Sequence, residues 1–133
     1  MPYTHTEFER LAATYPELRM ELTAEGDLII MPPTGGESGR RGFRLIGQLA
    51  QYLEENEIGE GFDSSTGFTL PNGAERAPDL AWVERSRWEA LTPDVREKFL
   101  PLCPDFAVEV LSPTDRLAKT QEKMQEYIAN GAR

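Results

Sequence analysis

The sequence contains little of the chemistry on which many enzyme classes depend. Among its 133 residues there is one cysteine, Cys103, and one histidine, His5. A single cysteine excludes an intrachain disulfide and favours a reducing cytoplasm as the compartment. Cys103 could act as a nucleophile only with His5 as its base. A small apolar side chain that fills space beside Leu102 and Pro104 is the better interpretation.

Long apolar runs and an excess of basic residues are also missing. No run approaches the length needed to span a bilayer, and residues 1–10 show no basic stretch followed by an apolar one, so we expect neither a membrane span nor a secretory signal. The formal net charge of −9 at pH 7 argues against tight, sequence-independent binding of nucleic acid, which depends on Lys and Arg. It is compatible with brief, metal-assisted contact with DNA. Arg40, Arg41, Arg44 and Arg76 supply local positive charge that, taken alone, is interpreted as solvated surface.

The apolar pattern predicts one domain over residues 1–133. Helices are expected at 6–15, 37–55 and 115–130, with short helical turns at 86–91 and 93–99. Strands are expected at 18–22, 28–31, 62–70 with a break at 64–67, 79–83 and 106–111, the last as a strong central strand. The apolar stripe of the long helix comprises Phe43, Ile46, Leu49, Ala50 and Leu53. The fold class is therefore α/β, a mixed sheet flanked by helices, and we expect its C-terminal strands to be missing because no strand follows to cover the last helix.

Two acidic residues lie inside apolar segments that are typical of strands. Asp79 heads the segment 79–83, and Glu109 interrupts the segment 106–111. An unpaired charge in such a place is costly, so both carboxylates need a cation or protons nearby. Each residue taken alone has another interpretation: Asp79 as a polar residue at a strand edge, and Glu109 as the partner of Lys123 or an arginine in a structural salt bridge.

The last helix is expected to bring a lysine to these two acids. A strand advances about 10 Å from Glu109 to Ser112, and Lys123 lies about 12 Å along a helix that begins near Asp115. A helix that folds back over the sheet therefore places Lys123 level with Glu109, although Lys123 alone would be interpreted as a solvated residue. Two carboxylates suit Mg²⁺ or Mn²⁺, and a divalent ion with a lysine suits the cleavage of phosphodiester bonds. Glu37, in the first turn of the long helix, could add a third acid.

These segments together resemble the Uma-type family of endonucleases, within the PD-(D/E)xK restriction-endonuclease-like superfamily. The resemblance covers 28–33, Gly36-Glu37, 78–81, 104–113, 123–127 and Gly131. It implies a restriction-endonuclease-like fold, with Asp79 and Glu109 as metal ligands, Lys123 as the catalytic lysine and Glu37 as the helix acid. In the wider superfamily the lysine usually stands two residues after the acid, where this chain has Leu111. The resemblance therefore requires that the lysine has moved to the helix.

The resulting hypothesis is a cytoplasmic DNA endonuclease that depends on Mg²⁺ or Mn²⁺ and touches DNA transiently. Cleavage of both strands would favour a homodimer with two-fold symmetry. A second hypothesis is a non-catalytic binding or assembly module that keeps the nuclease fold, which the acidic net charge favours. A glycosidase that uses Asp79 and Glu109 as its carboxylate pair is a third hypothesis, and a weaker one because it gives Lys123 no role.

Overall fold

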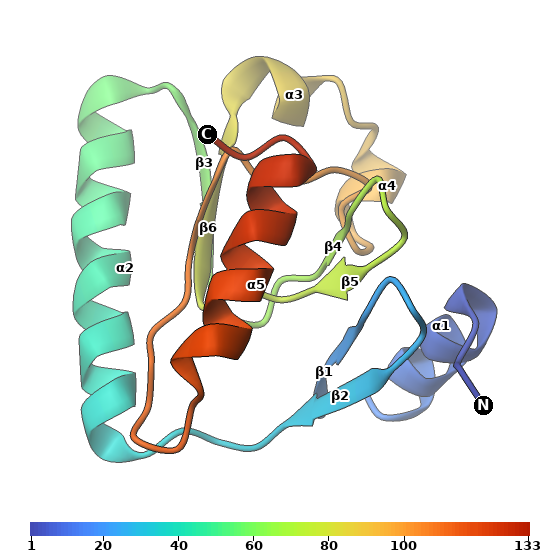
Figure 1. Cartoon of the computed structure of the whole chain (residues 1–133). Coiled ribbons are helices and arrows are strands. Elements are labelled where there is room, and N and C mark those ends of the chain that lie inside the picture. Colours follow the sequence, from blue (N-terminus) through green and yellow to red (C-terminus); the bar gives the residue numbers. More distant parts are fainter.

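The computed structural model describes all of residues 1–133 and contains two antiparallel sheets with helices packed around them (Figure 1). The helices are α1 (His5–Thr14), α2 (Gly36–Asn56), α3 (Arg85–Glu89), α4 (Pro93–Arg96) and α5 (Leu117–Ala129). The strands are β1 (Arg19–Leu22), β2 (Leu28–Met31), β3 (Gly59–Phe62), β4 (Phe68–Thr69), β5 (Glu75–Arg76), β6 (Leu80–Glu84) and β7 (Phe106–Val108). None of the helices combines the length and the apolar composition needed to cross a membrane.

Local signals in the sequence explain where the helices begin. Thr4 caps α1, because its hydroxyl accepts a hydrogen bond from the Glu7 N–H while the Glu7 carboxylate accepts one from the Thr4 N–H. Thr92 caps α4 by accepting a hydrogen bond from the Val95 N–H, with Pro93 in the first turn. Helices α2 and α5 lie within two residues of their predicted bounds, and the apolar periodicity of their sequences is the reason.

The first sheet has the strand order β2-β1-β5-β4. Strand β1 pairs with β2 and, on its other side, with β5 through Leu22 and Glu75. Helix α1 covers this sheet by packing Phe8 against Met20 and Leu22. The sheet therefore holds two short strands, β1 and β5, firmly side by side, and both of them carry buried charged residues.

The second sheet has the order β3-β6-β7, so the prediction of a central strand over 106–111 is wrong. β6 is the central strand, and β7 lies at the edge and ends at Val108. The physical reason is that the Val110 N–H donates to the Asp79 carboxylate, at 2.5 Å, instead of to the backbone of β6. Helix α2 lies on one face of this sheet and α5 on the other (Figure 1).

The main core lies between the second sheet and α5. Cys103 is 1% exposed and packs in this core near Tyr127, which confirms its interpretation as a small apolar filler. Burial raises the pKa of its thiol, so Cys103 is held as the unreactive neutral form. The predicted apolar stripe of α2 is only partly buried: Leu53 is buried, whereas Phe43 is 80% exposed. Phe43 therefore does not belong to the core.

Candidate active site

The structure brings three of the predicted residues together. Leu80 pairs with Val108 in the antiparallel ladder, so the next residues outward, Asp79 and Glu109, lie opposite each other on the same face. Helix α5 covers that face and places Lys123 Nζ 3.1 Å from Glu109 Oε1. The expected location of Lys123 beside Glu109 is thus confirmed, and so is the salt bridge that was the alternative interpretation of Glu109.

A fourth acid, Glu21 of β1, lies at the same place and was missed by the sequence analysis. Its side chain is 2% exposed. Lys123 Nζ donates to Glu21 Oε2 at 3.2 Å and lies 3.1 Å from Oε1. The backbone N–H of Ala77 donates to Glu21 Oε2 at 2.8 Å. Glu21 stands between Met20 and Leu22, both buried, which is the same pattern, an acid within an apolar strand, that singled out Glu109.

Arg76 of β5 is the second cation at this place, and its interpretation as solvated surface is wrong. It is 6% exposed, and it donates to Glu21 Oε1 at 3.2 Å and to Glu126 Oε1 of α5 at 2.7 Å. We call Glu21, Arg76, Glu109, Lys123 and Glu126 the charged network. It contains three carboxylates and two cations, so it carries an excess of one negative charge when all groups are ionised.

Asp79 is held in a fixed orientation beside the charged network. Arg19 Nη2 lies 3.3 Å from Asp79 Oδ1, and the Val110 N–H donates to Oδ2. The same guanidinium also donates to the Ala77 carbonyl at 2.5 Å. Because both carboxylate oxygens have donors, Asp79 is presented as a pre-oriented carboxylate next to Glu109.

Glu109 has a raised pKa in these surroundings. Burial raises the pKa of Glu109 to about 7, the negative charges of Glu21 and Asp79 add to the rise, and the Lys123 ammonium opposes it. The Tyr127 hydroxyl donates to Glu109 Oε1 at 3.4 Å, and burial together with the neighbouring Glu109 raises the pKa of Tyr127 above its ordinary value. Near neutral pH the buried Glu109 side chain is therefore stabilised either by binding a proton or by an additional cation nearby.

This raised pKa predicts a pH dependence of stability. Between pH 4.5 and about 7 the folded state holds a proton on Glu109 that the unfolded chain has released, so the free energy of unfolding falls as pH rises. The fall amounts to about 3 kcal/mol over this range. Urea unfolding in EDTA from pH 5 to 8 should show it in the parent protein, and Glu109→Gln should flatten the profile. An equal slope in both proteins would contradict the assignment.

Glu37 is not brought to this site. It lies on the exposed surface of α2, where it pairs with Arg40 and, at 3.9 Å, with Arg41, and the hydrogen bond from Arg40 lowers its pKa. No group of three or more acidic, histidine or cysteine residues is arranged to hold a metal ion. The role of Glu37 as the helix acid stays a prediction.

The pair of Asp79 and Glu109 nevertheless fits a divalent ion. Glu109 Oε2 accepts no hydrogen bond and reaches solvent, so one of its oxygens is open to a ligand. The excess negative charge of the surroundings favours a cation. Mg²⁺ commonly takes only one or two carboxylates and completes its shell with water and phosphate oxygens, so two acids are sufficient.

A hollow of about 450 Å³ lies at the edge of the sheet, next to Glu109. It is bordered by Arg41, Arg44 and Leu45 of α2 and by the residues of the segment Val108–Leu111. Two arginines that were predicted only as surface residues thus stand beside the segment that carries the acid.

The model of a family described as "Uma2: Putative restriction endonuclease" matches residues 5–133. The chain belongs to the Uma2 family. The crystal structure of a protein described as "a putative nuclease belonging to DUF820", from Anabaena variabilis ATCC 29413, is similar to this Uma2 chain with a TM-score of 0.80 and 21% identity, over 98% of this chain and 70% of that one. This similarity confirms the restriction-endonuclease-like fold. No curated protein matches the sequence.

The structure also shows how a lysine reaches the acid from another element. Leu111, two residues after Glu109, is 39% exposed and offers no charge. Lys123 of α5 instead reaches Glu109 from the covering helix. An ammonium can therefore stand beside the acid without being on the same strand.

Proposed function

We propose that this Uma2 protein is a metal-dependent DNA endonuclease that hydrolyses phosphodiester bonds. The observation that carries the proposal is the meeting of Asp79, Glu109 and Lys123 at one edge of the second sheet, with an open carboxylate oxygen on Glu109. The family match supports a nuclease in general. The metal and the phosphodiester substrate are inferred from the chemistry of two carboxylates next to an ammonium.

Each residue of the site has a distinct part in this proposal. A bound Mg²⁺ or Mn²⁺ would polarise a phosphoryl oxygen and lower the pKa of a water molecule. Asp79, fixed by Arg19 and the Val110 N–H, and Glu109, through its open oxygen, would hold that ion. Lys123 would stabilise the negative charge that develops on the phosphate, because its ammonium is already held in place by two carboxylates.

The arginines at the neighbouring hollow give the proposed substrate a place to bind. The net charge of −9 repels DNA as a whole, so contact depends on local positive charge. Arg41 and Arg44 are the basic residues that border the hollow beside Glu109. They would contact phosphates next to the one that is cleaved, and they would orient the strand without reading its sequence.

Plasmid nicking tests this proposal. The parent protein is expected to convert supercoiled plasmid to open circles with Mg²⁺ or Mn²⁺ and not with EDTA. Asp79→Asn and Glu109→Gln are each expected to lower the rate by about 100-fold or more, because each removes a charge that holds the ion. Both substitutions keep the size of the side chain. Circular dichroism checks that each variant is folded before its rate is compared with that of the parent.

Three further variants sharpen the nicking experiment. Glu55→Gln changes an exposed acid of α2 outside the site and is expected to leave the rate unchanged. Arg44→Ala is expected to raise KM for DNA more than it lowers kcat. Glu37→Gln tests whether Glu37, the fourth predicted site residue, takes part in the reaction. A loss of nicking rate as large as that of Asp79→Asn would place Glu37 in the reaction. Equal rates for the parent, Asp79→Asn and Glu109→Gln would end the proposal.

One observation favours the second candidate, a non-catalytic binding module. Lys123 and Arg76 already neutralise much of the buried negative charge without any metal ion, so the site is a stable salt-bridge network as it stands. Calorimetric titration with Mg²⁺ and Mn²⁺ separates the two candidates. Binding that Asp79→Asn weakens supports the nuclease, and no binding at millimolar concentration supports the module.

A further inference from the structure

A second buried acid lies where helix α1 meets the first sheet. Glu75 and Arg76 are neighbours in β5, so their side chains point to opposite faces of that sheet. Arg76 enters the charged network, whereas the Glu75 side chain faces α1 and is only 1% exposed. Its Oε1 lies 2.5 Å from Nδ1 of His5, which is the first residue of α1. This is the only ion pair between α1 and the first sheet.

Glu75 has few hydrogen-bond donors for a buried carboxylate. The Thr69 hydroxyl of β4 donates to Oε2 at 2.6 Å. Oε1 accepts no hydrogen bond and has only the His5 ring beside it. Burial raises the pKa of Glu75, against the opposing effects of the Thr69 hydroxyl and of the His5 ring. Glu75 therefore depends on a proton or on the positive charge of His5 to remain buried.

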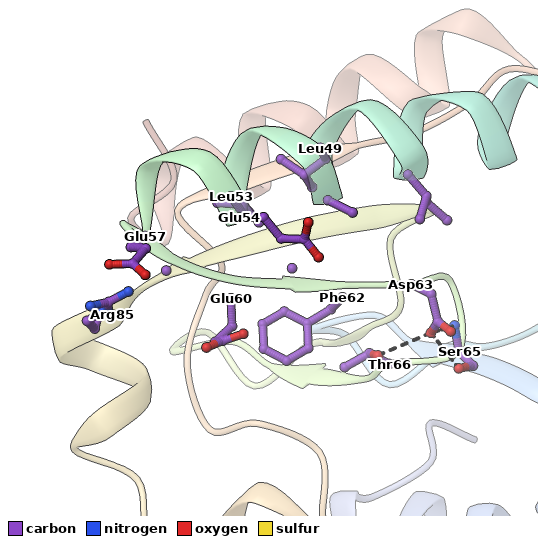
Figure 2. A pocket seen from close by; sticks show the side chains of 14 residues that line it. Leu49, Leu53, Glu54, Glu57, Glu60, Phe62, Asp63, Ser65, Thr66 and Arg85 are labelled. Atoms are coloured by element: carbon purple, nitrogen blue, oxygen red, sulfur yellow. Dashed lines mark hydrogen bonds between the residues drawn. The ribbon is translucent and has the colours of Figure 1, made fainter.

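Asp63, at the rim of the cleft between α2 and β3, is an acid in the opposite situation (Figure 2). Its Oδ1 accepts hydrogen bonds from the N–H and the hydroxyl of Ser65 and from the hydroxyl of Thr66. These hydrogen bonds, of which the one from the Ser65 hydroxyl has the largest effect, hold the pKa of Asp63 below its ordinary value. Asp63 is thus stable as an anion through local donors alone, which Glu75 is not.

The His5 ring stands between two carboxylates. Nε2 lies 2.9 Å from Oε1 of Glu9, one turn further along α1, and Nδ1 faces Glu75. A neutral imidazole has one N–H and one bare nitrogen. It therefore leaves one of the two carboxylates opposite a lone pair, where the contact is repulsive. Both contacts are attractive only when the trio holds one further proton, on the ring or on Glu75.

No other cation can replace this proton. Across the two ladders Glu75 faces Leu22 of β1 and Thr69 of β4, neither of which is charged. On the other side of α1 the segment after α4 packs Phe99 against Phe8. The remaining charged residues of α1 and of that segment form no ion pair with His5 or Glu75: Glu7, Arg10, Glu97 and Lys98.

We propose that one proton shared by His5, Glu9 and Glu75 latches α1 to the first sheet, and that α1 opens locally when rising pH removes it. The docked helix binds this proton more tightly than the opened helix does, so docking is favoured at low pH and is lost as pH rises. Phe8 stays packed on Met20 and Leu22 in the docked form, so the proton adjusts the docking of α1 and is not its sole support.

The latch acts on the sheet that supports the candidate active site. β1 supplies Glu21 and β5 supplies Arg76 to the charged network, and α1 is the helix that covers these strands. Opening of α1 therefore uncovers the face of the sheet opposite the network. The proposal does not depend on nuclease activity.

Hydrogen exchange of the 133-residue protein between pH 5 and 8.5 tests the latch. The opening constants of the α1 amides, corrected for the intrinsic effect of pH on exchange, are divided by those of His5→Lys. His5→Lys keeps a positive charge beside Glu75 at every pH used, and effects of pH elsewhere in the molecule act on both proteins and cancel. We expect the ratio to rise at least about tenfold over this range. A ratio that stays constant or falls would overturn the proposal.

Two further variants identify the groups that hold the proton. His5→Gln carries no charge and is expected to open α1 at least about fivefold more than the parent at pH 5, and as much as the parent at pH 8.5. Glu17→Gln changes an exposed acid just beyond α1 and is expected to follow the parent throughout. A His5→Gln protein that matches the parent at pH 5, or a Glu17→Gln protein that loses the rise with pH, would contradict the latch. No residue of the candidate active site is changed, so these results are independent of nicking.

Discussion

Replacement of Arg76 by methionine is expected to lower the free energy of unfolding by about 3–5 kcal/mol at neutral pH. Arg76 is buried and is paired with both Glu21 and Glu126. Its removal leaves the charged network with three carboxylates and one cation, and Glu21 is too buried to be solvated instead. Methionine occupies much of the space of the arginine stem, so the loss reports charge more than packing. Urea unfolding followed by circular dichroism measures it.

Two further proteins make the Arg76 result interpretable. Arg76→Met/Glu21→Gln is expected to recover part of the lost free energy of unfolding. The double variant no longer contains the Glu21 carboxylate that Arg76→Met leaves without its arginine partner. Arg133→Met breaks the exposed pair with Glu84 and is expected to change the free energy by less than about 0.5 kcal/mol. If Arg76→Met costs no more than Arg133→Met, the charged network does not stabilise the fold.

Replacement of Lys123 by methionine is expected to reduce the proposed nicking rate by about 100- to 1,000-fold at saturating DNA. The ammonium lies 3.1 Å from an oxygen of Glu21 and 3.1 Å from an oxygen of Glu109, so it is held at the position where charge would develop on the phosphate. The loss is expected in kcat more than in KM, because the arginines at the hollow, and not Lys123, would bind the strand. Single-turnover nicking measures the step directly.

The Lys123 experiment needs a test of folding, because the substitution also removes a cation from buried acids. Circular dichroism at the assay temperature provides it. Lys119→Met is the matched control: it lies one turn earlier on α5, is exposed and is expected to leave the rate unchanged. A folded Lys123→Met protein that nicks as fast as Lys119→Met would show that the ammonium has only a structural role.

The helices and the position of Lys123 could be predicted from sequence because they depend on periodicity and on length. Apolar residues at helical spacing located α2 and α5 within two residues. The rise per residue of a strand and of a helix was enough to place Lys123 level with Glu109, and the 3.1 Å contact confirms it. Both inferences use local geometry alone.

Features that depend on non-local pairing were not predictable in the same way. The apolar segment 106–111 could not reveal that β7 lies at an edge, or that the Asp79 side chain would take the Val110 N–H and end the strand early. Arg76 resembled a surface residue because its two carboxylate partners lie 55 and 50 positions away in the sequence. Glu21 could have been found, since it carries the same pattern as Glu109. The expected loss of C-terminal strands stays a prediction.

The charged network adds ionic contacts to the hydrophobic core that joins the two sheets and the last helix. Glu21 and Arg76 belong to the first sheet, Glu109 follows the last strand of the second, and Lys123 and Glu126 come from the helix between them. A cation that bound Glu109 would compete with Lys123 for that carboxylate. It would therefore also change how strongly the contact between the two sheets is stabilised. The free energy of unfolding should therefore report whether a cation is bound at Glu109, even in the absence of any substrate.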